Sequence, residues 1–164
     1  YQTEYGVKLG IDEIMDGVNA MLERYYCFEV PLKPGVAELL KRFRASGVKL
    51  CIATATDRYL VEAALKRCKA LSYFGEIFTC NEVGHGKDEP DIFEAALRFL
   101  GTEKSETVVF DDALYAIKAA KEAGFPVAAV CDSHEKNQEE IRVLSDVYLK
   151  DLAQLDKLQK LLPV

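Results

Sequence analysis

The sequence predicts a doubly wound α/β fold: a Rossmann-like parallel sheet with helices on both faces. Short segments that are apolar throughout alternate along the chain with longer amphipathic segments. Such continuously apolar strands are typical of a parallel sheet that helices cover on both faces. With 164 residues, 49% of them hydrophobic and 29% charged, the chain has the size and composition of one domain with a sizeable core.

Residues 1–30 are predicted to form a helical appendage to a sheet domain that spans residues 31–164. Apolar side chains recur at spacings of three and four from Ile11 to Tyr25, which is the pattern of one amphipathic helix. The apolar stripe of this helix requires a packing partner. Prolines then interrupt the helical pattern just after residue 30, so the boundary is placed there.

The sheet domain opens with a helix at residues 36–46, where apolar side chains keep helical spacing and Gly47 ends the helix. An apolar run at 48–53 is the first strand. The next helix, at 57–69, begins at an aspartate that can cap it. A second apolar run, at 76–80, is the second strand.

The remaining elements continue the alternation. They are a helix at 90–100, a strand at 107–110, a helix at 113–123, a strand at 127–130, a helix at 134–144 and a short strand at 146–149 before a closing helix. Proline is tolerated in the first helical turn, where Pro90 stands, and glycine commonly ends a helix, as Gly124 does here.

Composition excludes several classes of partner. The formal charge of −6 and the absence of basic runs argue against nucleic acid or an anionic membrane as the main partner. No apolar stretch approaches the roughly 18 residues of a membrane span, and no signal peptide is recognisable. The five cysteines form no C-x-x-C pair and are expected to be reduced thiols of a cytoplasmic protein. Because the chain begins at Tyr1 and not at methionine, we expect its natural start to be missing.

Polar residues follow three of the predicted strands, at the sheet edge where open parallel sheets bind ligands. The first is Thr54, with Thr56 and Asp57 close behind it at a helix start. A hydroxyl group beside free helix N–H groups favours an anion. The alternative is that Thr56 or Asp57 only caps the helix.

A loop with two glycines leads to Lys87 after the second strand. A lysine on such a loop can reach a phosphoryl group as a point charge. The loop is not a P-loop, because Asn81 and Asp88 stand where the Walker pattern requires glycine and serine or threonine. The alternative is an ordinary exposed lysine. His85 and His134 are expected to face solvent, since neither has a second ligand at metal-binding spacing.

Asp111 and Asp112 follow the third strand directly. Two adjacent carboxylates at a buried strand end repel one another unless a proton or a cation neutralises them. Oxygen ligands of this kind suit Mg²⁺. The alternative is that Asp112 simply caps the helix beginning at Ala113.

Together these motifs resemble the haloacid dehalogenase superfamily, and more closely its phosphoglycolate-phosphatase-like and β-phosphoglucomutase-like members, which have a helical cap inserted early in the chain. The resemblance covers about four fifths of the sequence. The matching stretches are Pro31-Leu32-Lys33-Pro34-Gly35-Val36, Cys51-Ile52-Ala53-Thr54, Gly86-Lys87-Asp88-Glu89-Pro90-Asp91-Ile92-Phe93, and Phe110-Asp111-Asp112 followed by Ala119-Ala120-Lys121-Glu122-Ala123-Gly124.

The resemblance implies a Mg²⁺-dependent phosphatase that hydrolyses a small phosphorylated metabolite through an aspartyl-phosphate intermediate. Thr54 matches the hydroxyl that binds phosphate in this family. Lys87 matches the family's phosphate-binding lysine, and the carboxylates of Asp111 and Asp112 match its Mg²⁺ ligands.

The chain departs from the family in one major respect. Family members begin with a central strand that ends in Asp-x-Asp, which supplies the nucleophile and the general acid and base, and this chain has no such motif. We therefore expect residues 1–30 to be only part of a cap and the nucleophile to lie upstream. Its strand belongs between those ending at Thr54 and Phe110, so a separate N-terminal fragment or a strand swapped from another chain is expected to fill that place.

Three other functions are compatible with parts of the pattern. One is a catalytically inactive fragment or phosphate-binding module, and another is a phosphosugar mutase. The third is a receiver domain, which also uses aspartates, a threonine and a lysine. By analogy with that family its acidic pair comes first, whereas here Thr54 and Lys87 precede the pair.

Overall fold

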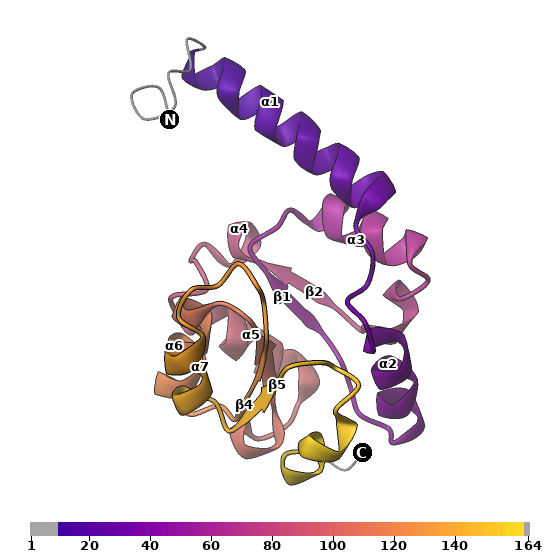
Figure 1. Ribbon diagram of the computed structural model, residues 1–164, viewed down its shortest axis with the longest axis vertical. Coiled ribbons are helices and arrows are strands. Elements are labelled where there is room, and N and C mark those ends of the chain that lie inside the picture. The colour runs from indigo at the N-terminus through magenta and orange to yellow at the C-terminus, as the bar shows by residue number, and fades with distance from the viewer. Residues whose placement is uncertain (1–9, 163–164) are drawn as a thin grey trace.

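Short parallel strands form the centre of the computed structural model, which describes residues 10–162 (Figure 1). The strands are β1 (Ile52–Thr54), β2 (Ile77–Thr79), β3 (Val109–Asp111), β4 (Val127–Val130) and β5 (Val147–Leu149). Every strand pair is parallel, as the continuously apolar runs predict. The α/β class predicted from the sequence is confirmed.

Helices connect the strands and cover both faces of the sheet. They are α1 (Ile11–Arg24), α2 (Val36–Ala45), α3 (Arg58–Arg67), α4 (Cys80–Val83), α5 (Asp91–Leu100), α6 (Leu114–Glu122) and α7 (Gln138–Leu144). A π-helical turn (Tyr25–Glu29) follows α1, and the last helical segment is a 3₁₀ helix (Leu155–Lys160). None of the helices within the described range is long and apolar enough to cross a membrane.

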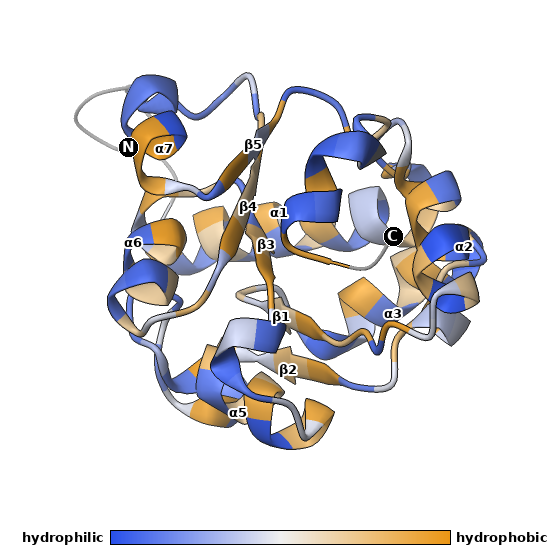
Figure 2. Cartoon of the chain, turned by 90° about the horizontal axis from the view of Figure 1, so that it is seen from below, coloured by the Kyte–Doolittle hydropathy of each residue, from blue (hydrophilic) through white to orange (hydrophobic). Residues whose placement is uncertain are grey.

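Strand β4 shows why these strands are apolar on both sides. Val127 and Ala129 pack into a core cluster with α5, α6 and α7. Ala128, which points the opposite way, packs with α2, β5 and the C-terminal 3₁₀ helix. Figure 2 shows the apolar strands between these helical layers. Two separate cores therefore meet at one sheet.

The sheet is interrupted between β1 and β3. β1 pairs with β2, while β3, β4 and β5 form a second set, and no ladder joins β1 to β3 within residues 10–162. This is the place where the sequence analysis expects a strand to be missing. The interruption also explains why β1 is shorter than the predicted strand 48–53: only the residues opposite β2 have a partner strand for their backbone groups.

Two further boundaries differ from the prediction. The strand predicted at 76–80 ends at Thr79, where α4 begins. The helix predicted at 134–144 starts only at Gln138. The side-chain amide of Gln138 donates to the carbonyl groups of Asp132 and Glu135, at 2.8 and 3.0 Å. These bonds hold the residues before Gln138 in a non-helical turn.

Helix α1 extends away from the sheet (Figure 1) and buries none of its residues. Ile11 and Met21 are 72% and 63% exposed, so the packing partner expected for the apolar stripe is not among the described residues. The π-helical turn packs against α3, where the Arg67 guanidinium contacts the carbonyl oxygen of Val30. The division of the chain at residue 30 stays a prediction.

The chain enters the sheet domain through a tight turn at Gly35. This residue has φ +84°, and a Cβ atom there would lie 2.6 Å from the backbone nitrogen of Ala153. Gly47 also has a positive φ, +72°, but no atom lies within 4 Å of its Cβ position. Gly35 is therefore required both by its dihedral angle and by a close backbone approach.

We expect Gly35→Ala to destabilise the fold more than Gly47→Ala. The left-handed conformation costs an alanine about 1–2 kcal/mol at either position. At Gly35 the overlap with Ala153 adds about 1–3 kcal/mol, the usual cost of overpacking. Urea unfolding of both variants measures the difference, and equal losses of unfolding free energy would contradict this account of the turn.

Candidate functional site

Asp111 ends β3 at the carboxyl edge of the sheet and is buried. Its Oδ1 accepts hydrogen bonds from the backbone N–H groups of Asp112 and Ala113, at 2.9 and 3.0 Å. These bonds turn the chain from β3 toward α6. The N-cap of α6 is Ala113, whose side chain makes no capping bond, so the alternative that Asp112 caps this helix is wrong.

Lys87 reaches the same carboxylate from the loop that follows β2. Its Nζ contacts the Asp111 Oδ2, and the two side chains are only 14% and 5% exposed. Lys87 is thus not the ordinary exposed lysine of the alternative interpretation. A largely buried ammonium group paired with a buried carboxylate is held in place by both charge and hydrogen bonding.

The loop that carries Lys87 is fixed by a reciprocal cap. The Thr79 Oγ1 accepts from the Glu82 N–H at 3.2 Å, and the Glu82 carboxylate accepts from the Thr79 N–H at 3.1 Å. This cap begins the short helix α4 directly at the end of β2, and Gly84, with φ +91°, ends it.

Arg58, the first residue of α3, connects this cap to α3. Its Nε and Nη2 donate to the two carboxylate oxygens of Glu82, at 2.6 and 2.9 Å, and its Nη1 donates to Glu76 at 3.0 Å. Hydrogen bonding from Arg58 lowers the pKa of Glu82 to about 2. Arg58 therefore ties the start of α4, from which the chain continues to Lys87, to the start of α3.

Asp112 is paired with Lys33, for which the sequence predicts no role at the site. The Lys33 Nζ donates to the Asp112 Oδ2 at 2.8 Å and to the Asp132 Oδ2 at 2.9 Å. Although partial burial opposes it, bonding to these two carboxylates raises the pKa of Lys33. The pKa of Asp132 lies well below its ordinary value because of the His134 N–H and the Lys33 ammonium.

Asp132 was missed by the sequence analysis, although a signal for it existed. It comes two residues after the apolar run 127–130, at the same sheet edge where Asp111 ends β3. His134 beside it is 94% exposed, and His85 is 58% exposed, as expected for residues that face solvent.

Thr54 ends β1 on the other side of the sheet interruption. Its Oγ1 accepts from the Thr56 N–H at 3.1 Å, which leaves its own O–H free to donate to an anion. Asp57 stands at the N-cap of α3, but its carboxylate accepts from Asn81 at 2.8 Å and makes no cap. In the described part of the chain, Thr54 makes no hydrogen bond to Lys87, Asp111 or Asp112.

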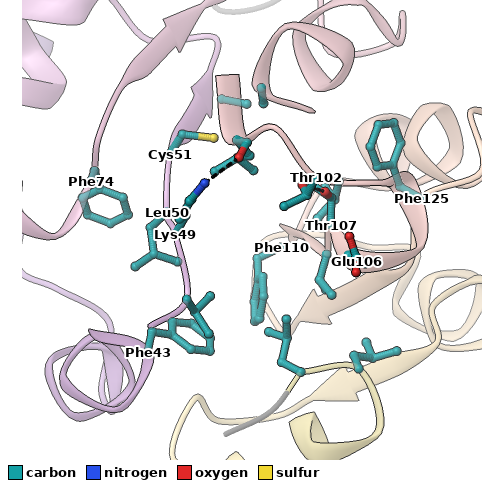
Figure 3. Close-up of a pocket in the computed structure, with 18 of the residues that line it drawn as sticks. Phe43, Lys49, Leu50, Cys51, Phe74, Thr102, Glu106, Thr107, Phe110 and Phe125 are labelled. Atoms are coloured by element: carbon teal, nitrogen blue, oxygen red, sulfur yellow. Dashed lines mark hydrogen bonds between the residues drawn. The ribbon is translucent and has the colours of Figure 1, made fainter. Parts of the chain in front are cut away.

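A cavity of about 710 Å³ lies between the two parts of the sheet. Figure 3 shows Leu50 and Cys51 on one wall and Thr107 and Phe110 on the other. The lining is mostly apolar, but Lys87 and Asp111 also contribute to it, so the cavity reaches the carboxyl edge of the sheet. The candidate site and the interruption of the sheet are one continuous space.

The two adjacent carboxylates fit part of a Mg²⁺ site. Mg²⁺ takes one or two protein carboxylates and completes its octahedron with water and phosphate. Among residues 10–162 no group of three or more His, Cys, Asp or Glu side chains is arranged to hold a metal ion. Lys87 and Lys33 already bring one positive charge to each of the two carboxylates, so the lysines share the neutralisation that the sequence analysis assigned to a metal.

Comparison with known proteins gives a consistent match. A family model for haloacid dehalogenase-like hydrolases matches residues 3–124. The chain is 33% identical over 121 residues to validoxylamine A 7'-phosphate phosphatase of Streptomyces hygroscopicus subsp. limoneus, an alignment covering 74% of this chain and 55% of that protein. It is 34% identical over 118 residues to protein CbbY of Cereibacter sphaeroides, covering 68% and 51%. The chain thus spans about half the length of these curated relatives.

Solved structures share the fold. The crystal structure of CbbY from Rhodobacter sphaeroides in complex with phosphate superposes with a TM-score of 0.78 at 30% identity, covering 94% of this chain and 70% of that one. The structure of a predicted phosphoglycolate phosphatase from Haemophilus somnus 129pt has a TM-score of 0.84 at 20% identity, covering 96% and 72%. At that lower identity the likeness concerns the fold alone.

We expect Arg58→Met to raise the pKa of Glu82 from about 2 toward 4.5, its ordinary value. Because the folded-state pKa is lowered, the ion pair stabilises the fold above the unfolded-state pKa, and this contribution is lost as pH falls toward 2. The difference in stability between wild type and variant should therefore shrink as pH falls from 4.5 toward 2. NMR titration of the Glu82 carboxyl carbon and acid unfolding measure both effects.

A matched control is Lys66→Met, which removes a 3.0 Å ion pair with Glu62 on the same helix α3. It should leave the titration of Glu82 unchanged. A Glu82 carboxyl group that titrates identically with and without Arg58 would show that the Thr79 cap alone lowers its pKa.

Proposed function

Because this chain belongs to the haloacid dehalogenase-like hydrolase family, we propose that it forms the core of a phosphatase acting on a small phosphomonoester. One observation carries the proposal: the Lys87 ammonium lies on the buried carboxylate of Asp111, beside Asp112, at the carboxyl edge of the sheet. A fixed positive charge next to metal-binding oxygens is what a phosphoryl group requires as negative charge develops on it.

Each residue has a distinct part in the proposed reaction. Lys87, held by Asp111, faces the phosphoryl oxygens as a point charge that needs no rearrangement during the reaction. The free O–H of Thr54 donates to another phosphoryl oxygen and orients the group. Mg²⁺ bound at Asp111 and Asp112 would supply further neutralisation of the phosphoryl charge.

The nucleophile comes from a strand that fills the gap between β1 and β3. The two strands leave backbone groups unpaired toward the gap, and a parallel strand there would pair with both edges. The apolar lining of the cavity suits a strand with apolar side chains on both faces. An aspartate at its carboxyl end would then lie between Thr54 and Asp111. Its carboxylate would attack the phosphorus and form an aspartyl phosphate while the P–O bond to the substrate alcohol breaks and the alcohol leaves. Water would then hydrolyse the aspartyl phosphate, which releases phosphate and restores the carboxylate.

The source of that strand is a segment upstream of Tyr1, a separate N-terminal fragment or a strand swapped from another chain. Without any of these, the chain is a phosphate-binding module with no turnover. The 164 residues contain no Asp-x-Asp sequence, so the choice between the two functions depends on whether such a strand is supplied.

The substrate class rests on the relatives. Their names include a phosphatase for validoxylamine A 7'-phosphate and one for phosphorylated carbohydrates, and a CbbY variant was crystallised with xylulose-(1,5)bisphosphate. Phosphorylated carbohydrates are therefore the first compounds to test. Hydrolysis is preferred to mutase activity because a structure described as a putative β-phosphoglucomutase is only 24% identical and supports the fold alone.

A cytoplasmic location also belongs to the proposal. All five cysteines lie in the described part of the chain, and they form no disulfide there. Free thiols of this number are typical of a reducing compartment.

The proposal is tested by comparing the 164-residue chain with a longer polypeptide that includes an upstream strand ending in Asp-x-Asp. We expect the longer polypeptide to release phosphate from phosphorylated carbohydrates and the shorter chain to show none. Lys87→Met in the longer polypeptide should lower kcat at least about a hundredfold, because one preorganised charge is lost. Lys118→Met should keep full activity, because Lys118 is an exposed residue of α6 that pairs with Glu140 on α7. Retention of more than half of the activity by Lys87→Met would contradict the role of Lys87.

The proposed strand has a consequence for the chain by itself. Backbone groups left unpaired in the gap cost about 1–3 kcal/mol each when they are buried away from water. Unpaired strand edges also recruit other chains. We therefore expect the isolated chain to sediment as a dimer or larger assembly, and an 18.3 kDa monomer that unfolds cooperatively would show that the gap needs no strand.

A further inference from the structure

We propose that Lys33 is an exchangeable counter-ion for Asp112, which releases this carboxylate when a divalent cation binds and remains paired with Asp132. The inference rests on the proposed magnesium site and adds two residues to it. Lys33 lies in the segment between the π-helical turn and α2, and its side chain contacts residues that follow β3 and β4.

The geometry provides two partners for one ammonium group. The Lys33 Nζ lies 2.8 Å from the Asp112 Oδ2 and 2.9 Å from the Asp132 Oδ2. Its side chain is 45% exposed, so water can replace a lost contact. Lys33 can therefore leave Asp112 without losing its only anionic partner.

Asp132 is held ready to keep the ammonium group. Its other carboxylate oxygen, Oδ1, accepts from the His134 N–H at 2.9 Å and lies 3.1 Å from the His134 Nδ1. The adjacent Cys131 N–H donates to the Leu149 carbonyl at 2.8 Å, which ties this segment to β5. Asp132 is thus fixed by backbone contacts that do not depend on Lys33.

Lys87 differs from Lys33 in every respect that matters for exchange. It is 14% exposed, and Asp111 is its one anionic partner among the ion pairs of the described residues. Both oxygens of Asp111 are engaged, one by Lys87 and the other by two backbone N–H groups. A divalent cation that binds at this sheet edge therefore displaces Lys33 from Asp112 more easily than Lys87 from Asp111. Displacement follows because an ammonium group and a divalent cation on one carboxylate would repel each other.

The test is Mg²⁺ binding to the 164-residue chain, read by titration calorimetry and by the Mg²⁺-dependent rise in Tm. Lys33→Met should tighten Mg²⁺ binding about two- to fivefold, the scale of one half-exposed ion pair. Asp132→Asn should weaken it by a similar factor, since Lys33 then has only Asp112 to bind. The double variant should bind as Lys33→Met does, because without Lys33 the loss of Asp132 has no effect on competition.

The double variant separates exchange from simple charge effects. If the effects of the two substitutions add, then each charge acts only through space, and the proposal is overturned. Lys118→Met is a matched control, because Lys118 is also 45% exposed and pairs with a carboxylate, at 2.6 Å. It should leave Mg²⁺ binding unchanged.

The outcomes also separate this inference from the proposed function. If wild type binds Mg²⁺ and Lys33→Met binds it no more tightly, the exchange is overturned and the phosphatase proposal stays intact. No response to Mg²⁺ in any variant overturns the exchange and the magnesium part of that proposal together. Phosphate release by the longer polypeptide, measured separately, decides the phosphatase reaction itself.

Discussion

Backbone N–H and C=O groups inside a parallel sheet must be hydrogen-bonded, and this requirement governs the whole architecture. It is met within β1 and β2 and within β3, β4 and β5, but not between the two sets. The helices and the C-terminal 3₁₀ helix still cover both faces, so the unpaired edges lie within the domain, beside the apolar cavity. The carboxyl end of this gap is also where Lys87 and Asp111 meet.

The site at that end is organised by charge sharing. Three carboxylates, from Asp111, Asp112 and Asp132, face two ammonium groups, from Lys87 and Lys33. Lys87 serves only the buried Asp111, whereas Lys33 bridges the two more exposed carboxylates. Lys87 therefore has one buried partner, whereas Lys33 has two partners that are open to solvent.

Polar contacts hold the loops at the sheet edge. Some of these contacts can be predicted from the sequence and others cannot. Thr79 and Glu82 form a capping box, whose spacing is a recognised sequence pattern. The Arg58 contacts with Glu82 and Glu76 span 24 and 18 residues, and no local pattern announces them. The predicted strand 76–80 ends one residue early because the cap at Thr79 outweighs the β-propensity of the apolar run.

The sequence by itself determined the parallel α/β class, most element positions, the strand ends that carry Thr54, Asp111 and Asp112, and the loop that carries Lys87. It could do so because apolar periodicity and strand-end placement are local properties of the chain. Only the tertiary structure decided that Lys87 is buried on Asp111, that Lys33 bridges Asp112 and Asp132, and that α1 leaves its apolar stripe exposed. The two lysine contacts join residues that are 24 to 99 positions apart in the sequence, and the exposure of α1 depends on whether a packing partner is present. Which distant residues meet follows from how the strands and loops pack in space, and no local sequence pattern encodes that packing.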